Sequence, residues 1–333
     1  MKIMVFDVPA DSGGALSILE EFYKKFKLDE ENTYVFVLGC GVLKNSENIE
    51  VLNFPWIKKS WLHRLFFDYF VAPKLVANRG IDKVLSLQNV MVPRTKIPQT
   101  IYVHNALPFS EYRFSIFKNK LLWAHQNVLS RFIFRSIKSA TKVIVQTQWM
   151  KKKCIDMLDV NPEKIEVLSP DCSLKPHRFY QRPQSGRLAF FYPASGVVFK
   201  NHEVIIRACL RLKKLGIFDY DVFFTLSSSD GGYAKTIYST AIENKLPISF
   251  LGSISREEVF GYYEKAILVF PSYIETVGLP LLEARRHATP ILASNSDFSQ
   301  EILSGYDGVS FFSPFDVESL VTLMKNLING KEK

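Results

Sequence analysis

The 333-residue sequence has few cysteines, no long uncharged apolar run and no excess of glycine or proline. Its four cysteines are scattered, without the C-x-x-C or Cys/His spacing that holds zinc, so we expect reduced thiols. No stretch reaches the roughly 18 apolar residues that cross a bilayer, and the apolar run at 2–6 is too short for the core of a signal peptide. These absences exclude disulfide-stapled, collagen-like and membrane-spanning classes, and indicate a globular cytoplasmic protein.

The residues that are present favour two domains. A chain of this length usually divides into domains of roughly 100 to 200 residues, and 47% hydrophobic residues are enough to fill two cores. The net charge of +9 favours an anionic partner, such as a phosphorylated substrate, anionic lipid or nucleic acid. Charge alone does not choose among them.

Short apolar runs alternate with amphipathic helical stretches in both halves, which predicts two parallel sheets covered by helices. The predicted strands are 3–6, 34–38, 84–87, 100–103 and 143–146, then 188–192, 222–226, 248–251, 267–270, 290–293 and 308–312. Between the two sets, 169–186 contains three prolines and no sustained periodicity. We therefore expect an α/β protein with Rossmann-like domains at 1–168 and 187–333, joined by a linker at 169–186.

A glycine pair, Gly13 and Gly14, follows the first predicted strand and precedes a helical pattern. Glycines at such a turn let the backbone approach a ligand, and a helix N-terminus offers free N–H groups to an anion. A tight turn needed only for packing explains the pair equally well. The full G-x-G-x-x-G pattern of nicotinamide and flavin enzymes is missing.

The most informative segment is 270–284, FPSYIETVGLPLLEA, which follows a predicted buried strand. It predicts a glycine loop and then a helix, with Pro280 in the first helical turn, where a missing N–H is harmless. Loops at the carboxyl ends of parallel strands line the ligand crevice of such sheets. Glu275 falls in the loop and Glu283 about one turn into the helix, so they are not expected to form an acid/base pair. Taken alone, two glutamates are more simply a solvated loop charge and a helix-dipole partner.

This segment resembles the signature of the retaining glycosyltransferases of GT-B fold, family four, also called glycosyl transferases group one. In that signature two glutamates with seven intervening residues flank a Gly-Leu-Pro turn, as Glu275, Gly278-Leu279-Pro280 and Glu283 do here. The resemblance extends over most of the chain. It implies two Rossmann-like domains whose parallel sheets face each other across a cleft, with the acceptor on the N-terminal domain and a nucleotide-sugar donor on the C-terminal domain.

The resemblance also implies roles for individual residues in donor binding. Glu275 would contact sugar hydroxyls, Glu283 the ribose, and the backbone N–H groups of Thr276, Val277, Gly278 and Leu279 the sugar and diphosphate. Lys200 looks like the family's phosphate-binding lysine, which stabilises the leaving group. The arginine that commonly precedes this lysine is missing from 194–198.

The same resemblance implies a catalytic role for His104, which follows the predicted strand 100–103. A lone histidine is more often a structural residue, but imidazole can bind sugar hydroxyls and carry a proton near neutrality. Lys200 and backbone dipoles holding the diphosphate leave no need for a metal, and no cofactor is expected beyond the donor itself. The resemblance further implies retention of anomeric configuration without a protein nucleophile.

Two segments, 56–67 and 118–138, mix lysine and arginine with bulky apolar residues. Helices of this composition can lie in an anionic headgroup layer, or they can turn their apolar face to a core. Peripheral association with the inner face of the cell membrane would suit a lipid-diphosphate-linked acceptor in bacterial cell-surface polysaccharide assembly.

The sequence is also compatible with three other functions. A sugar-nucleotide epimerase of similar fold would turn over donor without acceptor. A non-catalytic sugar-nucleotide or glycan-binding subunit is suggested by the missing arginine. Nucleic-acid binding is the weakest, because no recognised module is present.

Overall fold

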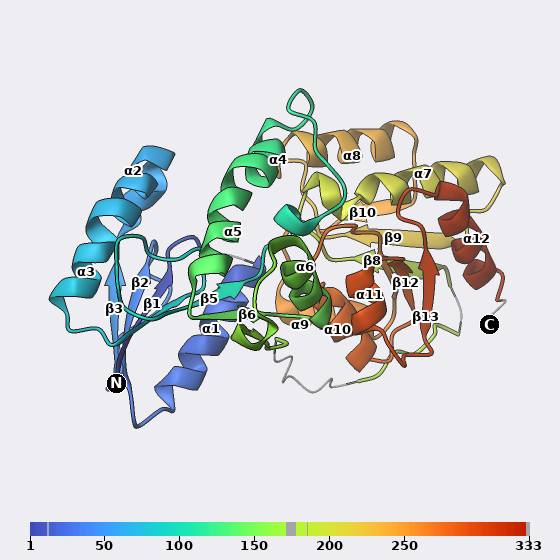
Figure 1. Cartoon of the computed structure of the whole chain (residues 1–333). Helices are drawn as coiled ribbons and strands as arrows, with labels where there is room; N and C mark the ends of the chain where they lie inside the picture. Colours follow the sequence, from blue (N-terminus) through green and yellow to red (C-terminus); the bar gives the residue numbers. More distant parts are fainter. Residues whose placement is uncertain (12, 171–177, 185, 331–333) are drawn as a thin grey trace. The chain divides into compact units, whose positions relative to one another are not determined.

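The computed structural model describes residues 1–11, 13–170, 178–184 and 186–330, which form two compact units, 1–171 and 172–333. Each unit is a parallel sheet with helices packed against it (Figure 1). The strand runs predicted from the sequence all form strands, together with β3 and β7, which the periodicity did not indicate.

The first unit contains a seven-stranded sheet in the order β3-β2-β1-β4-β5-β6-β7, with every pairing parallel. The strands are β1 (Lys2–Asp7), β2 (Thr33–Leu38), β3 (Ile49–Asn53), β4 (Lys83–Ser86), β5 (Gln99–Val103), β6 (Lys142–Val145) and β7 (Ile165–Val167). The helices are α1 (Gly13–Lys27), α2 (Trp61–Phe66), the π-helical turn η2 (Phe67–Val71), α3 (Ala72–Asn78), α4 (Lys120–Ala124), η4 (His125–Leu129), α5 (Ser130–Ser139) and α6 (Gln148–Leu158).

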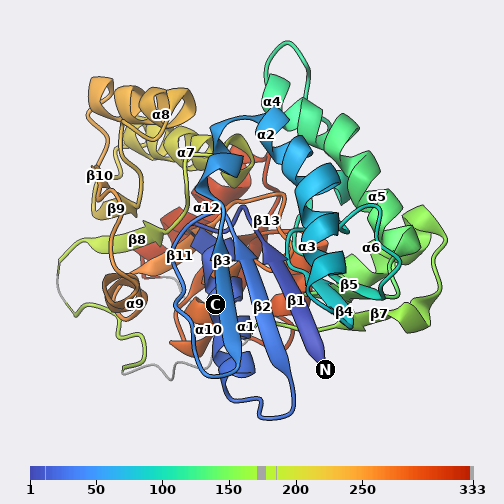
Figure 2. The ribbon, with the colours of Figure 1, turned by 90° about the vertical axis from the view of Figure 1, so that its left-hand side faces the viewer.

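Alternating strand residues supply the two faces of this sheet. Val5 and Phe36 pack with the α1 residues Ile18 and Leu19. Their neighbours along the strands pack on the other face, with Phe67, Ala72 and Val76 of the η2–α3 segment. Figure 2 shows β3, β2 and β1 side by side. The sheet therefore has helices on both faces, as parallel sheets require.

The second unit contains a six-stranded parallel sheet in the order β10-β9-β8-β11-β12-β13. The strands are β8 (Leu188–Tyr192), β9 (Tyr220–Phe224), β10 (Ile248–Phe250), β11 (Ile267–Phe270), β12 (Ile291–Ser294) and β13 (Val309–Phe312). The helices are α7 (His202–Lys214), α8 (Gly232–Glu243), α9 (Arg256–Tyr263), α10 (Leu279–Arg286), α11 (Asp297–Ile302) and α12 (Val317–Ile328), with the turn η6 (Val198–Lys200) before α7. Its core is rich in fully buried aromatic side chains of β8, β9 and β11.

The predicted linker, 169–186, is only partly covered, because residues 171–177 and 185 lie outside the described residues. The described part runs along the second unit. The backbone N–H groups of Tyr180 and Gln181 donate to the carbonyls of His287 and Glu264, at 2.7 and 2.9 Å. The Arg182 guanidinium donates to the Leu327 carbonyl at 2.8 Å.

Candidate functional site

Two loops leave the second sheet at its switch point, where β8 lies between β9 and β11. One runs from the end of β8 through η6 to α7 and carries Lys200; the other runs from the end of β11 to α10 and carries Glu275. Loops at the carboxyl ends of neighbouring strands on either side of such a point border the ligand crevice of open parallel sheets. The topology therefore brings together two residues that lie 75 positions apart.

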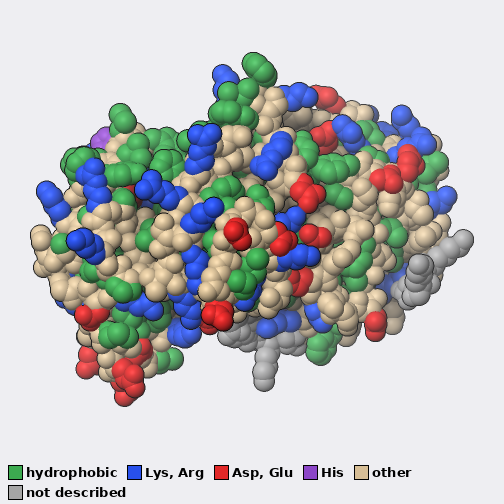
Figure 3. All heavy atoms as spheres, viewed as in Figure 1, with side chains coloured by type: hydrophobic (Ala, Val, Ile, Leu, Met, Phe, Trp, Pro, Cys, Tyr) green, Lys and Arg blue, Asp and Glu red, His purple; other side chains and the backbone are tan. Residues whose placement is uncertain are grey.

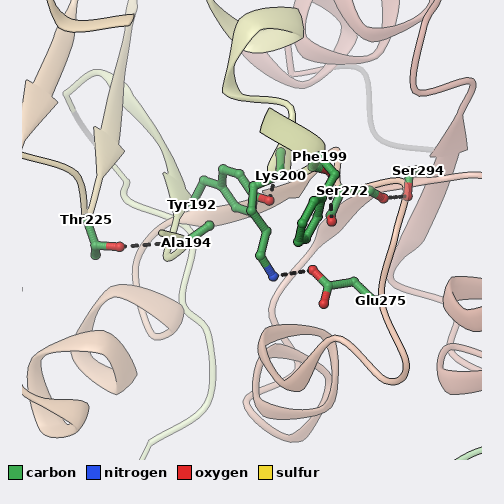
Figure 4. A network of polar contacts seen from close by, with 8 residues as sticks. All are labelled: Tyr192, Ala194, Phe199, Lys200, Thr225, Ser272, Glu275 and Ser294. Carbon is green, nitrogen blue, oxygen red and sulfur yellow. Dashed lines mark hydrogen bonds and ion pairs between the residues drawn. The ribbon is translucent and has the colours of Figure 1, made fainter. Parts of the chain in front are cut away.

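Lys200 and Glu275 form an ion pair between Nζ and Oε1 (Figure 4). Their side chains are 21% and 14% exposed, so the pair is partly withdrawn from water but still reachable from outside. Electrostatic interactions are stronger in such a place than on an open surface. The structure thus brings two of the residues predicted for donor binding into direct contact.

Hydrogen bonds fix the backbone of both loops (Figure 4). The Phe199 carbonyl accepts from Ser272 Oγ and from the Tyr273 N–H, both at 3.2 Å. The buried Tyr192 hydroxyl donates to the Lys200 carbonyl at 2.8 Å. Ser294 Oγ in turn donates to the Ser272 carbonyl. These hydrogen bonds tie the two loops to each other and to residues of β8 and β12, so the backbone beneath the ion pair is restrained.

Gly278 ends the second loop in a left-handed conformation, with φ of 75°, and caps α10. A Cβ atom at this position would lie 3.0 Å from Phe270 Cζ and 3.3 Å from Leu281 Cδ1. Glycine is therefore required both for the backbone angle and for the space. The predicted donor-binding residues before it, Thr276 and Val277, are buried, and Leu279 begins the helix.

Glu283 lies within α10 and has two protein partners. Arg256 Nη2 lies 3.1 Å from Oε1, and the Tyr263 hydroxyl donates to Oε2 at 3.2 Å. Burial raises the pKa of Glu283, and the positive charge of Arg256 opposes that rise. The sequence analysis did not identify Arg256 or Tyr263, since their contact with Glu283 joins α9 to α10. Each carboxylate oxygen of Glu283 thus has one protein partner and keeps acceptor capacity for a further donor.

The other predicted site residues belong to the first unit. Burial lowers the pKa of His104 to about 4, and its backbone N–H donates to Asn89 Oδ1 at 2.7 Å. Gly13, with φ of 60°, begins α1 and Gly14 follows it. A Cβ on Gly13 would meet nothing within 4 Å, so its conformation, and not crowding, favours glycine there.

A buried carboxyl group that the sequence analysis missed lies at the end of β1. Both oxygens of Asp7 are buried without a hydrogen-bond partner among the described residues. Burial raises its pKa to about 7, opposed by the charge of Arg64, by a weak approach of the Ala10 N–H and by the charge of Lys58. An acidic residue directly after an apolar strand was the only sequence signal.

The described residues hold no group of three or more His, Cys, Asp or Glu side chains that could bind a metal. An Asp-x-Asp sequence is present at 219–221, but it lies at the amino end of β9. Tyr220 between the two acids is fully buried, and Asp221 pairs with Arg187 at 3.4 Å. These aspartates are therefore at the opposite end of the sheet from Lys200 and Glu275.

Residues 177–333 match the sequence family described as glycosyl transferases group 1, a stretch that contains both loops and α10. The matched stretch lies in the second unit and spans a little under half of the chain. The O-antigen chain mannosyltransferase RfbU of Salmonella typhimurium is 24% identical over 265 residues, covering 78% of this chain and 69% of RfbU.

Two solved structures show the same fold. WaaG, a glycosyltransferase involved in lipopolysaccharide biosynthesis, superposes with a TM-score of 0.73 at 15% identity, covering 99% of this chain and 90% of WaaG. HepE of Anabaena, in complex with UDP-glucose, gives 0.70 at 14% identity with coverage of 99% and 90%. The chain therefore has the GT-B fold of two Rossmann-like units, and its second unit matches the glycosyl transferases group 1.

Proposed function

We propose that the protein is a retaining glycosyltransferase that moves a sugar from a nucleoside-diphosphate donor to a glycan or lipid-linked acceptor in bacterial cell-surface polysaccharide assembly. The observation that carries this is the Lys200–Glu275 pair at the switch point of the second sheet, beside the glycine-capped start of α10. The names of the relatives support the setting, since RfbU acts on O-antigen and WaaG in lipopolysaccharide biosynthesis.

In this proposal the diphosphate replaces Glu275 as the partner of Lys200. The ammonium group then neutralises the phosphate oxygens, and Glu275 becomes free to accept hydrogen bonds from the sugar hydroxyls. The backbone N–H groups of residues 276–279, at the positive N-terminal end of α10, donate to the sugar and the diphosphate. Glu283 accepts from the ribose with the lone pairs that Arg256 and Tyr263 leave unused. The UDP-glucose held by HepE supports a nucleoside-diphosphate sugar as the donor class.

In the reaction, the bond between the anomeric carbon and the diphosphate oxygen breaks, and a bond from the acceptor oxygen to that carbon forms on the same face. The departing diphosphate takes the acceptor proton, so no protein nucleophile is needed. Lys200 stabilises the charge that develops on the leaving group. This arrangement requires no metal and no cofactor other than the donor.

His104 would bind a hydroxyl group of the donor sugar. Because burial lowers its pKa to about 4, the ring is neutral at pH 7. A neutral imidazole donates a hydrogen bond from one nitrogen and accepts with the other. The proposed role is therefore orientation and hydrogen bonding within the site, without a fixed positive charge.

Thermal unfolding in the presence of UDP, GDP, ADP and their sugars tests the donor site, because a ligand of the native state raises the apparent stability. We expect one nucleotide to raise the unfolding temperature of the wild type, and Lys200→Ala and Glu283→Ala to lose that rise. Lys235→Ala, on α8, is the control and should respond like the wild type. A wild type that responds to none of these nucleotides would contradict donor binding.

Two other functions predict different kinetics. A sugar-nucleotide epimerase would convert the donor sugar with no acceptor present, whereas a transferase needs an acceptor for stable turnover. A non-catalytic binding subunit would bind the nucleotide sugar and release no nucleoside diphosphate with any acceptor. Nucleotide release measured with and without lipid-linked glycan acceptors separates the three, and the anomeric coupling in the product's NMR spectrum tests retention.

We also propose that the protein binds peripherally to the inner face of the membrane, where a lipid-linked acceptor would lie. Among the described residues no helix is long and apolar enough to cross a bilayer. The first of the two basic and apolar segments supports a surface contact, because α2 buries none of its residues. The segment from α2 through η2 exposes five large apolar side chains: Trp61, Leu62, Leu65, Phe66 and Phe70.

Cations accompany this apolar surface, as Figure 3 shows over α2. Lys59 lies just before α2 and the neighbouring α3 contributes Lys74, whereas Lys58 pairs with Asp11 at 2.7 Å. Apolar side chains that enter a headgroup layer, with lysines beside the lipid phosphates, are typical of peripheral helices. In the second segment α4 also buries none of its residues, but α5 buries Ile133 and Ile137 in the core. The membrane contact is thus assigned to α2 and η2.

Sedimentation with vesicles tests this contact. We expect the protein to pellet with vesicles containing phosphatidylglycerol at low salt, and Leu62→Ser/Phe66→Ser to reduce the pelleted fraction severalfold. Leu215→Ser, an exposed apolar residue of the second unit, is the matched control. Wild-type protein that stays in the supernatant at low salt would refute the membrane contact and leave the donor site unaffected.

A further inference from the structure

Asn201 lies directly after Lys200 and has an unusual backbone. Its φ of 59° and ψ of 38° are left-handed, and it forms the junction between η6 and α7. Glycine adopts this conformation without strain, whereas asparagine tolerates it at some cost. Glycine would form this turn without strain, so the presence of asparagine indicates that its side chain has a function of its own.

The side-chain amide of Asn201 joins three separate segments of the second unit. Its Nδ2 donates to the Pro314 carbonyl at 2.7 Å and to the Pro271 carbonyl at 3.3 Å. Pro314 follows β13, and Pro271 begins the loop that carries Glu275. An amide nitrogen has two protons, and these two contacts use both. Pro271 is buried, so its carbonyl needs such a partner.

Lys200 is therefore held between two points of attachment. On its N-terminal side the Phe199 carbonyl is bound by residues 272 and 273. On its C-terminal side Asn201 is bound to Pro271 and Pro314. These contacts restrain the backbone on both sides of Lys200, whose ammonium pairs with Glu275.

We infer that Asn201 is a positioning residue, which sets the geometry of Lys200 relative to Glu275 for the donor diphosphate. It contacts neither the proposed donor nor the reacting atoms. This inference rests on the proposed donor site. It assigns the function of Asn201 to the two protons of its side-chain amide and not to its backbone angle.

Two variants separate the side chain from the backbone. Asn201→Gly keeps the left-handed turn and removes both hydrogen bonds. Asn201→Asp keeps the shape but cannot donate when ionised. For both we expect kcat/KM for the donor to fall by about tenfold or more, mainly through KM. The unfolding temperature of Asn201→Gly should fall modestly, because relief of backbone strain offsets only part of the cost of the two lost hydrogen bonds.

Asn48 provides a matched control in the first unit. Its Nδ2 also donates to two carbonyls, those of Phe26 and Asp29, at 2.8 and 2.6 Å. Asn48→Ala should lower the unfolding temperature and leave the donor kinetics unchanged. If Asn201→Gly behaves in the same way, with only a stability loss, the positioning role is refuted.

A second measurement does not depend on activity. Acetylation of Lys200 by acetic anhydride, followed by mass spectrometry of its peptide, reports how firmly the ammonium is held against Glu275. We expect severalfold faster acetylation of Lys200 in Asn201→Gly, with the other lysines of the digest unchanged. An unchanged rate would overturn the inference. If the wild type binds no nucleotide, the proposed function fails, and this rate still decides the role of Asn201.

Discussion

Replacing Gly278 by alanine tests whether the loop of Glu275 depends on the packing beneath it. The left-handed angle alone costs about 1–2 kcal/mol for a residue with a Cβ. The new methyl group would also lie 3.0 Å from the ring of Phe270, which is 1% exposed and has no room to retreat. Overpacking of this kind adds about 1–3 kcal/mol. We therefore expect a total loss of about 2–5 kcal/mol.

Gly305→Ala is the matched control. Gly305 has nearly the same angle, 69° against 75°, but a Cβ there would meet nothing within 4 Å. It should lose only the backbone contribution of about 1–2 kcal/mol. The difference between the two variants then measures the crowding against Phe270 and Leu281.

Urea unfolding is the assay, and the spectroscopic probe matters. All four tryptophans lie between residues 56 and 149. Their fluorescence therefore reports on the first unit, and the second unit must be followed by far-ultraviolet circular dichroism. Equal losses for Gly278→Ala and Gly305→Ala would refute the argument from crowding. Gly278→Ala should also weaken nucleotide binding, whereas Gly305→Ala should not.

For three further substitutions the structure predicts the direction in which stability or nucleotide binding changes. Burial raises the pKa of Asp7 to about 7, so the free energy of unfolding of the wild type should fall as the pH rises from about 4 to 7. Asp7→Asn should remove this slope. In urea unfolding, the variant should gain up to roughly 3 kcal/mol relative to the wild type between pH 5 and pH 8. Equal slopes would contradict the buried unpaired carboxyl. Arg256→Ala removes the charge that lowers the pKa of Glu283, so the loss of nucleotide binding on acidification should begin at higher pH, as calorimetry at several pH values would detect. If binding is lost over the same pH range in Arg256→Ala and in the wild type, Arg256 does not influence the nucleotide site through Glu283. Ser255 forms a capping box with Glu258 at the start of α9, and Ser255→Ala should cost about 1 kcal/mol in urea unfolding, whereas a neutral result would show that this cap is not needed.

Periodicity predicted the five inner strands of the first sheet, which are largely buried and continuously apolar, and every strand of the second sheet, including its less buried edge strands β10 and β13. It missed β3, whose sequence IEVLN mixes polar and apolar residues, and β7, which has only three residues. Edge strands lie partly in water, so their sequences carry a weaker pattern.

The same distinction holds for the candidate site. Glu275 and Lys200 were chosen from local motifs, and the sheet topology brings them into contact. Arg256 and Asn201 were not found, because their importance lies in contacts with segments 27 and 113 residues away. No local pattern in a single sequence encodes such distances. For α2, composition left the core and surface alternatives open, and the three-dimensional burial favours the surface.

The ion pair between Lys200 and Glu275 has a consequence for the order in which a ligand would be recognised. In the ion pair each group balances the charge of the other, and a neutral sugar carries no charge that could replace either partner. An anion can separate them, because it supplies the negative charge that Lys200 loses. Recognition of the sugar by Glu275 is then conditional on prior recognition of the phosphates. A free monosaccharide would meet a carboxylate that shares one oxygen with Lys200, whereas a sugar attached to a diphosphate would bring the anion that releases that oxygen, so the proposed site would favour the attached sugar.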